Sequence, residues 1–215
     1  MEIRHCWKDC LKMKEVLFIL LDKYADWEAA HVAAALMSPD DGKPKYVVRT
    51  VALGKEPVRS IGCFTVLPDY NLATAPEDCA AVLLIGGRAW RKPEADRVVP
   101  FLRRVRARGG LVGAICGATV FLGKHGFLNE VRHTSHTLES LKEAAGENYT
   151  GERNYINEQA VSDGGIITAN GTAYLEFGRE VLTALQAAPQ EEIDEWYDYC
   201  KLGLYEAAKK RGDAL

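Results

Sequence analysis

The chain has 215 residues, of which 47% are hydrophobic and 27% charged, and its formal net charge is −3. A charge this mild, without a long block of lysine and arginine, argues against a nucleic-acid partner. No apolar run approaches the roughly 18 residues of a membrane span and the first dozen residues lack an apolar signal core, so we predict a cytoplasmic protein with no membrane partner.

The first 13 residues precede the first apolar run, and we predict that they form a variable N-terminal extension. Cys6 and Cys10 stand four residues apart in this segment, with only His5 close to them. That set offers too few ligands for a closed metal site, so we expect no metal. The six cysteines of the chain lack the spacing of a disulfide framework, and we expect free thiols.

The first half of the chain begins with a short, wholly apolar run at Val16–Leu21, which predicts a buried parallel strand. An alanine-rich segment follows and predicts a helix over Asp26–Met37. Lys45–Leu53 is typical of a second strand. Cys63–Leu72 alternates in polarity and predicts a short strand before a loop.

The middle of the chain repeats this strand and helix order. Ala80–Gly87 is a third apolar strand that ends in two glycines. Asp96–Arg108 has the spacing of an amphipathic helix and stops at a glycine pair. Leu111–Ile115 is a fourth buried strand, and Ala118–Gly126 has helical spacing.

The last third predicts a helix over His136–Gly146, a hairpin over Gln159–Ala169 and a late helix over Thr172–Gln186. The tail, residues 189–215, is amphipathic and rich in aromatic residues, and we expect a helical extension packed on the domain or on a partner chain. Strands that alternate with helices indicate an α/β fold with a mostly parallel sheet covered on both faces. We predict one main domain over residues 14–188.

Cys116 stands at the corner between the fourth strand and the helix after it. Small residues surround it, as in a nucleophile elbow, where a sharp turn exposes the reactive side chain above the sheet. A nearby helix N-terminus would favour the thiolate and lower the thiol pKa. The alternative, a small apolar cysteine in an ordinary turn, fits the local pattern equally well.

The glycine pair Gly86–Gly87 ends the neighbouring strand. Carboxyl ends of parallel strands meet at one edge of the sheet, so these backbone N–H groups are candidates, with that of Gly117, for an oxyanion hole beside Cys116. The alternative is an ordinary strand-to-loop turn. Three aromatic residues flank the same strand ends and are candidates for a pocket wall: Tyr24, Trp27 and Trp90.

A nucleophilic cysteine needs a group that exchanges protons with it. His136 lies just before a predicted helix and is our candidate. We expect His133 at the surface, His125 near the C-terminal end of the cysteine's helix, and His31 as a packing residue.

Five segments follow one another along the chain: "VLFILLDKYADWEAA", "VLLIGG", "GAICGATVFLGKHGFL", "TSH" and "ITANGTAYLEFGREVLTAL". This ordered set resembles the ThiJ/PfpI family, within the class I glutamine amidotransferase-like superfamily. The resemblance covers about residues 14–188. It implies a flavodoxin-like three-layer sandwich and a homodimer. It also matches Cys116 to the elbow cysteine and Glu28 to an acidic residue beside that thiol, with a proton shared between them.

The same resemblance places Gly87 and Gly117 where backbone N–H groups face the nucleophile, and His136 near the cysteine. Two departures limit it. The late segment has no histidine of the amidotransferase type, and Gly117 stands where the protease branch has a histidine.

Three hypotheses follow. The first is a cysteine-dependent enzyme, a hydrolase or lyase acting on a small carbonyl or amide compound, without a cofactor. The second is a non-catalytic redox or stress sensor that uses an oxidisable Cys116. The third is an amidotransferase-like pseudo-enzyme or partner-binding module.

Overall fold

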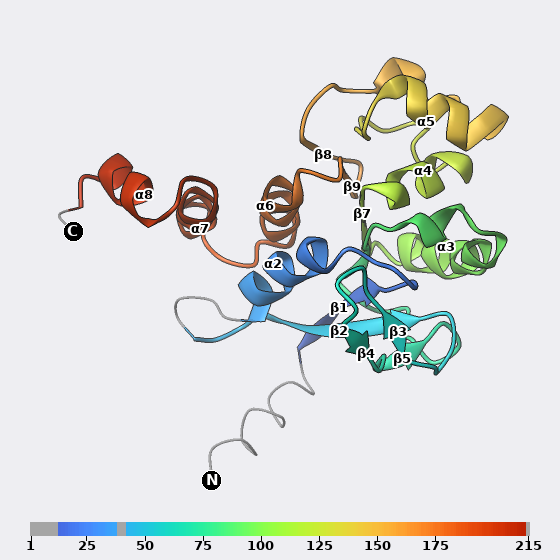
Figure 1. Ribbon diagram of the computed structural model, residues 1–215, viewed down its shortest axis with the longest axis horizontal. Coiled ribbons are helices and arrows are strands. Elements are labelled where there is room, and N and C mark those ends of the chain that lie inside the picture. The colour runs from blue at the N-terminus through green and yellow to red at the C-terminus, as the bar shows by residue number, and fades with distance from the viewer. Residues whose placement is uncertain (1–12, 38–41, 214–215) are drawn as a thin grey trace, which may run out of the picture.

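The computed structural model describes residues 13–37 and 42–213, and a seven-stranded sheet forms its centre (Figure 1). In spatial order the strands are β5 (Tyr70–Asn71), β2 (Tyr46–Ala52), β1 (Lys14–Ile19), β6 (Ala81–Leu84), β7 (Leu111–Ile115), β9 (Ile166–Ala169) and β8 (Ala160–Asp163). All neighbours pair in parallel except β8 and β9, which form an antiparallel hairpin. The predicted mostly parallel sheet and its hairpin are confirmed.

The central strands are apolar along their length because both faces of the sheet are covered. Every residue of β6 is buried, as are the last four residues of β1 and of β7. Their register aligns Ile19 with Leu84, and Leu84 with Ala114. The carboxyl ends of these three strands therefore meet at one edge, and the segments that follow them converge there.

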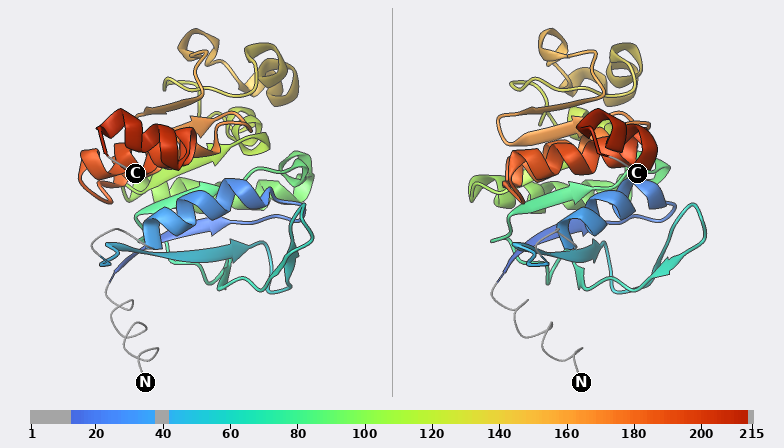
Figure 2. Two further views of the ribbon diagram at one scale, coloured as in Figure 1. Left: turned by 60° about the vertical axis from the view of Figure 1, so that its left-hand side comes forward. Right: turned by 90° about the vertical axis from the view of Figure 1, so that its left-hand side faces the viewer.

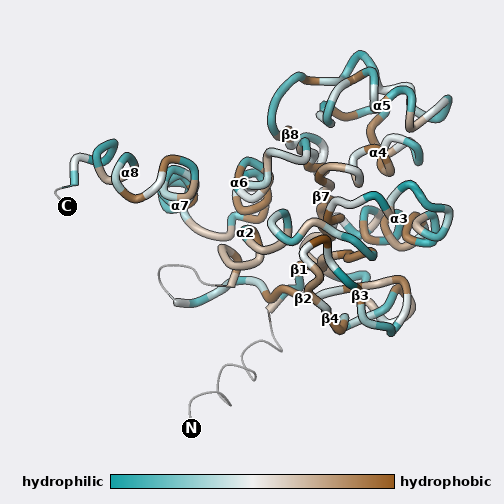
Figure 3. The backbone as a smooth tube through the Cα atoms, in the orientation of Figure 1, coloured by the Kyte–Doolittle hydropathy of each residue, from teal (hydrophilic) through white to brown (hydrophobic). Residues whose placement is uncertain are grey.

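Helices cover the two faces of the sheet in separate layers (Figures 1 and 2). One layer holds α2 (Asp26–Met37), α6 (Tyr174–Leu185) and α7 (Gln190–Leu202); the other holds α3 (Val99–Ala107), α4 (Gly117–Lys124) and α5 (Leu138–Ala145). Alternate residues of β1 enter two different cores, Leu17 on the α3 side and Phe18 on the α2 side. Figure 3 shows the hydrophobic colours gathered on the strands. The predicted three-layer α/β sandwich is confirmed.

Some elements differ from the sequence predictions. The segment after β2 forms a separate two-stranded ribbon of β3 (Val58–Arg59) and β4 (Thr65–Val66) before it reaches β5. The helix expected from Asp96 begins as the 3₁₀ helix η3 (Pro93–Val98), and α3 starts at Val99, where Pro100 suits a first turn. Other short 3₁₀ helices are η2 (Arg88–Arg91), η4 (Gly146–Asn148) and η5 (Glu152–Asn154).

The tail forms two helices, because Gly203 takes a φ of 83° between α7 and α8 (Leu204–Arg211). α7 packs against α6, whereas α8 packs against α7 and lies away from the sheet (Figure 1). None of the helices in the described ranges is long and apolar enough to cross a lipid bilayer. The predicted extension up to residue 12, with Cys6 and Cys10, lies outside the described residues.

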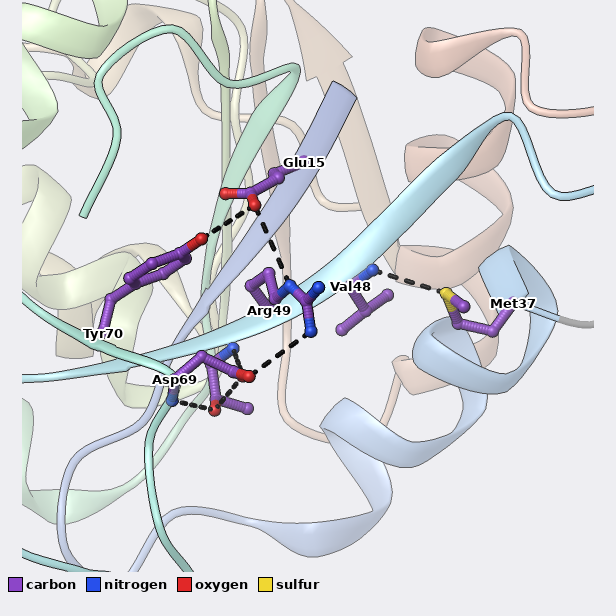
Figure 4. A network of polar contacts seen from close by, with 7 residues as sticks. Glu15, Met37, Val48, Arg49, Asp69 and Tyr70 are labelled. Carbon is purple, nitrogen blue, oxygen red and sulfur yellow. Dashed lines mark hydrogen bonds and ion pairs between the residues drawn. The ribbon is translucent and has the colours of Figure 1, made fainter. Parts of the chain in front are cut away.

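Figure 4 shows a polar network near the amino-terminal end of β1. This is the opposite end of the strand from the edge where the segments after the strands converge. Glu15 Oε1 accepts a hydrogen bond from the Tyr70 hydroxyl at 2.9 Å and lies 3.8 Å from Arg49 Nε. Arg49 also pairs with Asp69, with 3.5 Å between Nη1 and Oδ1. The Glu15 carboxylate thus has both a donor and a cation beside it.

Candidate active site

Cys116 occupies the turn between β7 and α4 in a strained conformation. Its φ of 59° and ψ of −129° are rare for a residue with a side chain. The Cys116 N–H donates to Ala169 O at 3.0 Å, which ties the turn to the end of β9. A strained residue between a strand and a helix is typical of a nucleophile elbow. Cys116 is only partly buried.

Glycines surround this turn because no side chain fits at their positions. A Cβ on Gly117 would lie 2.6 Å from Gly87 O, and a Cβ on Gly86 would lie 2.5 Å from Cys116 Cβ. The Gly86 N–H donates to Glu28 Oε2 at 2.8 Å. This N–H is therefore committed to the carboxyl group, which leaves Gly87 and Gly117 as the candidates for oxyanion binding.

Glu28 enters the site from the first turn of α2, and its side chain is only 1% exposed. Among the described residues its Oε1 atom makes no hydrogen bond. Burial raises the pKa of Glu28 to about 7, against the lowering effect of the Gly86 N–H and of the Cys116 thiol. The carboxyl group thus exchanges its proton near neutral pH.

The thiol of Cys116 departs from the sequence prediction. Burial first, and then the negative charge of Glu28, raise its pKa to about 11, although the Gly117 N–H and the Arg91 charge act to lower it. The prediction that the nearby helix N-terminus lowers the thiol pKa is wrong, because desolvation and the charge of Glu28 outweigh the N–H donor. The thiol therefore keeps its proton at a pH where Glu28 gives up its own, and the two groups are close enough to influence each other.

His136 lies at the same spot although it is exposed. A Cβ on Gly171 would be 2.8 Å from His136 Cε1 and 2.9 Å from Cys116 Sγ. The imidazole and the sulfur therefore border one small space, which exists because residue 171 has no side chain. The structure brings together Cys116, Glu28 and His136 from three different parts of the chain.

The three aromatic residues that were predicted to line a pocket differ in their exposure. Trp27 is 43% exposed on α2, one residue from Glu28 in the sequence. Trp90 is 2% exposed, packs on Phe121 at 4.8 Å between ring centroids and donates from Nε1 to Ile85 O at 2.6 Å. Trp90 therefore belongs to the core and not to a pocket wall. Tyr24 is also buried, beside Ser60.

His133 is buried, so its predicted place at the surface is wrong. Its Nδ1 bonds to Val131 O at 2.8 Å and its Nε2 bonds to the Tyr149 hydroxyl at 2.7 Å. Because partners satisfy both ring nitrogens, the ring is stable inside the protein, and burial lowers its pKa. His125 ends α4 as expected, with its Nε2 atom 2.9 Å from Asp96 Oδ1.

The sequence analysis missed two buried hydroxyl residues next to the site. Thr119 is the third residue of α4, and Ser135 precedes His136. Their oxygens lie 2.7 Å apart, and Thr119 also donates to Cys116 O at 2.7 Å. A threonine three residues after the elbow cysteine is the only local signal for this link, and its partner is 16 residues away.

Comparisons with known proteins agree with this geometry. The model of the DJ-1/PfpI family matches residues 14–184. The Bacillus subtilis protein named "Uncharacterized protease YdeA" is 33% identical over 201 residues, which are 94% of this chain and 98% of that protein.

Two solved structures resemble this one closely. A ThiJ/PfpI family protein from Bacillus anthracis has a TM-score of 0.85 at 30% identity, over 93% of this chain and 95% of that chain. A DJ-1 superfamily protein from Agrobacterium tumefaciens has a TM-score of 0.79 at 33% identity, over 89% of this chain and all of that chain (100%).

Proposed function

The chain belongs to the DJ-1/PfpI family, and we propose that it is a cysteine-dependent enzyme, a hydrolase or lyase acting at the carbonyl or amide carbon of small molecules. The observation that best supports this is the pairing of a partly accessible Cys116 with a buried carboxyl group whose pKa is near neutral. A base with a pKa close to the working pH is the most effective proton acceptor.

The first step of the proposed reaction uses the proton shared by Cys116 and Glu28. The sulfur forms a bond to the carbonyl carbon, the thiol proton ends on Glu28, and the electron pair of the carbonyl double bond moves to oxygen. Backbone N–H groups of Gly87 and Gly117 hold the resulting oxyanion. Because Glu28 takes the proton as the bond forms, a free thiolate need not exist beforehand.

The second step needs a group that moves protons on the substrate side, and His136 is the candidate. With an amide, the carbon–nitrogen bond breaks, protonated His136 gives its proton to the departing nitrogen, and an acyl-thioester remains on Cys116. Water then attacks the thioester carbon, His136 takes a proton from the water, and the carbon–sulfur bond breaks as Glu28 returns its proton to the sulfur, which releases the carboxylic acid. The ring's position across Gly171 from Sγ supports this role.

We also propose that the protein is a homodimer. Four large hydrophobic side chains are exposed on the first turn of α2 and around the β3–β4 ribbon: Trp27, Ile61, Phe64 and Leu67. The Gly62 N–H donates to Asp26 Oδ2 at 2.8 Å and holds this loop against α2. An exposed apolar surface of this kind suits a second copy of the chain. A cytoplasmic location remains a prediction of the sequence.

A redox or stress sensor is the second candidate function. Glu28 Oε1 is buried and makes no hydrogen bond among the described residues. A protonated carboxyl group there can donate to an oxygen on oxidised Cys116 and stabilise a sulfinate. The partner-binding module has one feature in its favour, the exposed side chains of Tyr199, Leu202, Leu204 and Tyr205 near the α7–α8 corner.

The test compares Cys116→Ser with Cys63→Ser, which changes an exposed cysteine in the β3–β4 loop. Both variants and the wild type are assayed on a panel of small dicarbonyls and amides. We expect Cys116→Ser to lose turnover and Cys63→Ser to keep it. Turnover retained in Cys116→Ser contradicts the enzyme, and selective peroxide oxidation of Cys116 without turnover on any substrate favours the sensor.

A further inference from the structure

A chain of three hydrogen-bonding groups joins the elbow of Cys116 to the loop that carries His136. The Thr119 hydroxyl lies 2.7 Å from Cys116 O and 2.7 Å from the Ser135 hydroxyl. Thr119 is 0% exposed and Ser135 is 2% exposed, so water does not compete for either bond. The chain therefore connects two elements of the site through the protein interior.

The direction of these bonds follows from the number of protons available. A carbonyl oxygen only accepts, so the Thr119 hydroxyl uses its single proton on Cys116 O. Ser135 must then donate to Thr119 Oγ1. Each hydroxyl has one required orientation, and a single substitution breaks the chain at a known bond.

At the elbow, the hydrogen-bond chain ends on Cys116, whose backbone conformation is strained. Cys116 O accepts from Thr119 Oγ1 at 2.7 Å and from Thr119 N at 3.1 Å. These two donors fix the peptide plane that follows the positive φ of Cys116. A helical threonine commonly bonds to a carbonyl one turn before it, but such a bond does not normally extend to another element.

The other end of this hydrogen-bond chain is fixed by further bonds, which are buried or partly buried. The Thr134 N–H donates to Thr168 Oγ1 at 2.8 Å, and the Thr134 hydroxyl donates to Glu158 O at 2.8 Å. The Tyr155 hydroxyl donates to Ser135 O at 3.3 Å. The backbone just before His136 is thus held on both sides, and Ser135 transmits its position to α4.

We propose that Thr119 and Ser135 are positioning residues that hold the Cys116 sulfur and the His136 ring in a fixed relation across Gly171. Without the Thr119 hydroxyl the elbow relaxes toward an ordinary backbone conformation, and Sγ moves away from Glu28 and from the Gly117 N–H. The catalytic meaning of this role rests on the proposed function, whereas its effect on the reactivity of Cys116 does not.

The first test measures alkylation of Cys116 by iodoacetamide between pH 5 and 10, followed by mass spectrometry of the Cys116 peptide. Thr119→Val removes the hydroxyl at nearly constant volume, and Thr119→Ser restores it. We expect the valine variant to react about tenfold more slowly at pH 8, since small displacements at a reacting atom have effects of this size, and its pH profile to shift. The serine variant should stay within about twofold of the wild type.

Thermal unfolding of the same variants separates positioning from stability. A valine variant that unfolds at a lower temperature but keeps the wild-type alkylation rate and pH profile overturns the proposal. Failure of Thr119→Ser to restore the alkylation rate also overturns the proposal, because serine keeps the hydroxyl to which the proposal assigns the effect.

The second test uses Ser135→Ala, which leaves the bond from Thr119 to Cys116 O in place. We expect alkylation of Cys116 within about twofold of the wild type and, on any substrate found, a lower kcat with little change in KM. A kcat equal to that of the wild type overturns the assignment of Ser135. If the wild type turns over no substrate, the proposed function fails, and the alkylation results still decide the role of Thr119.

Discussion

Two glutamates lie toward opposite ends of the central sheet, and both have a buried oxygen that makes no hydrogen bond among the described residues. Glu15, near the amino end of β1, faces Arg49 and accepts from Tyr70 (Figure 4). Glu28, beside the carboxyl ends, has the Gly86 N–H and the Cys116 thiol, and burial raises its pKa to about 7. Glu28 is almost fully buried and burial is the main cause of its raised pKa, whereas Glu15 is partly exposed and has a cation beside it.

The two cysteines near these glutamates, Cys79 and Cys116, can be compared in the same way. Burial raises the pKa of Cys79, whose nearby charges include Glu15, and that of Cys116 to about 11 in each case. Cys79 is enclosed, whereas Cys116 is partly accessible and has a proton acceptor beside it. The pKa of the thiol alone therefore does not identify the reactive cysteine.

Replacing Glu28 by glutamine has the largest expected effect. Glutamine still accepts from the Gly86 N–H but cannot take the proton of Cys116, so we expect a loss of about 10²–10⁴-fold in turnover. Glu15→Gln is the matched control and should leave turnover near the wild-type value. Wild-type turnover in Glu28→Gln contradicts the role of Glu28 as the proton acceptor.

Glu28→Gln should also change how the free energy of unfolding depends on pH. Because the pKa of Glu28 rises from 4.5 to about 7 on folding, the folded state binds the proton more tightly than the unfolded state. Stability should therefore fall as pH rises from about 4.5 to 7, by about 3 kcal/mol in total. Urea unfolding at pH 5 and pH 8 measures this difference, which should disappear in Glu28→Gln. An equal pH dependence in both proteins contradicts the raised pKa.

Arg49→Met tests the surroundings of Glu15, since it leaves this carboxylate without its closest cation. We expect a loss of about 2 kcal/mol at pH 7, because a partly buried carboxylate loses its counter-charge. Urea unfolding at pH 7 gives the result. Alkylation of Cys116 is the control, and it should not change.

Tyr70→Phe has the smallest expected effect. It removes one hydrogen bond to Glu15 and leaves Arg49 in place, so we expect a loss of about 1 kcal/mol at pH 7. A shift in the midpoint of urea unfolding, at an unchanged slope, measures it. A loss larger than that of Arg49→Met means that the hydroxyl, and not the cation, stabilises Glu15.

The fold was predictable wherever local pattern and packing agree. The helix Asp26–Met37 and the strand Leu111–Ile115 have the predicted bounds, since their apolar spacing matches the layers that bury them. The sequence predicted a short strand within Cys63–Leu72, where β4 lies, but missed β3 and its pairing with β4, because two residues per strand leave little pattern to detect. The division of the tail depends on one backbone angle at Gly203.

The site was predictable in its residues and less so in its energetics. Cys116 and the glycines carry a local pattern of a tight turn, which the structure shows. The raised thiol pKa depends first on how deeply the thiol itself is buried and then on the charge of Glu28, and no local pattern contains that depth. Trp90 and His133 were misplaced for a similar reason, since distant partners satisfy their polar atoms inside the protein.

Gly86, Gly117 and Gly171 leave no room for even a methyl group around the sulfur, because a Cβ on each would lie within 3 Å of a neighbouring atom. New specificities cannot arise by filling this inner ring. Substitutions that enlarge the range of substrates must instead fall on residues outside this ring. A directed-evolution library should therefore randomise those outer positions and keep the three glycines, Cys116, Glu28 and His136 unchanged.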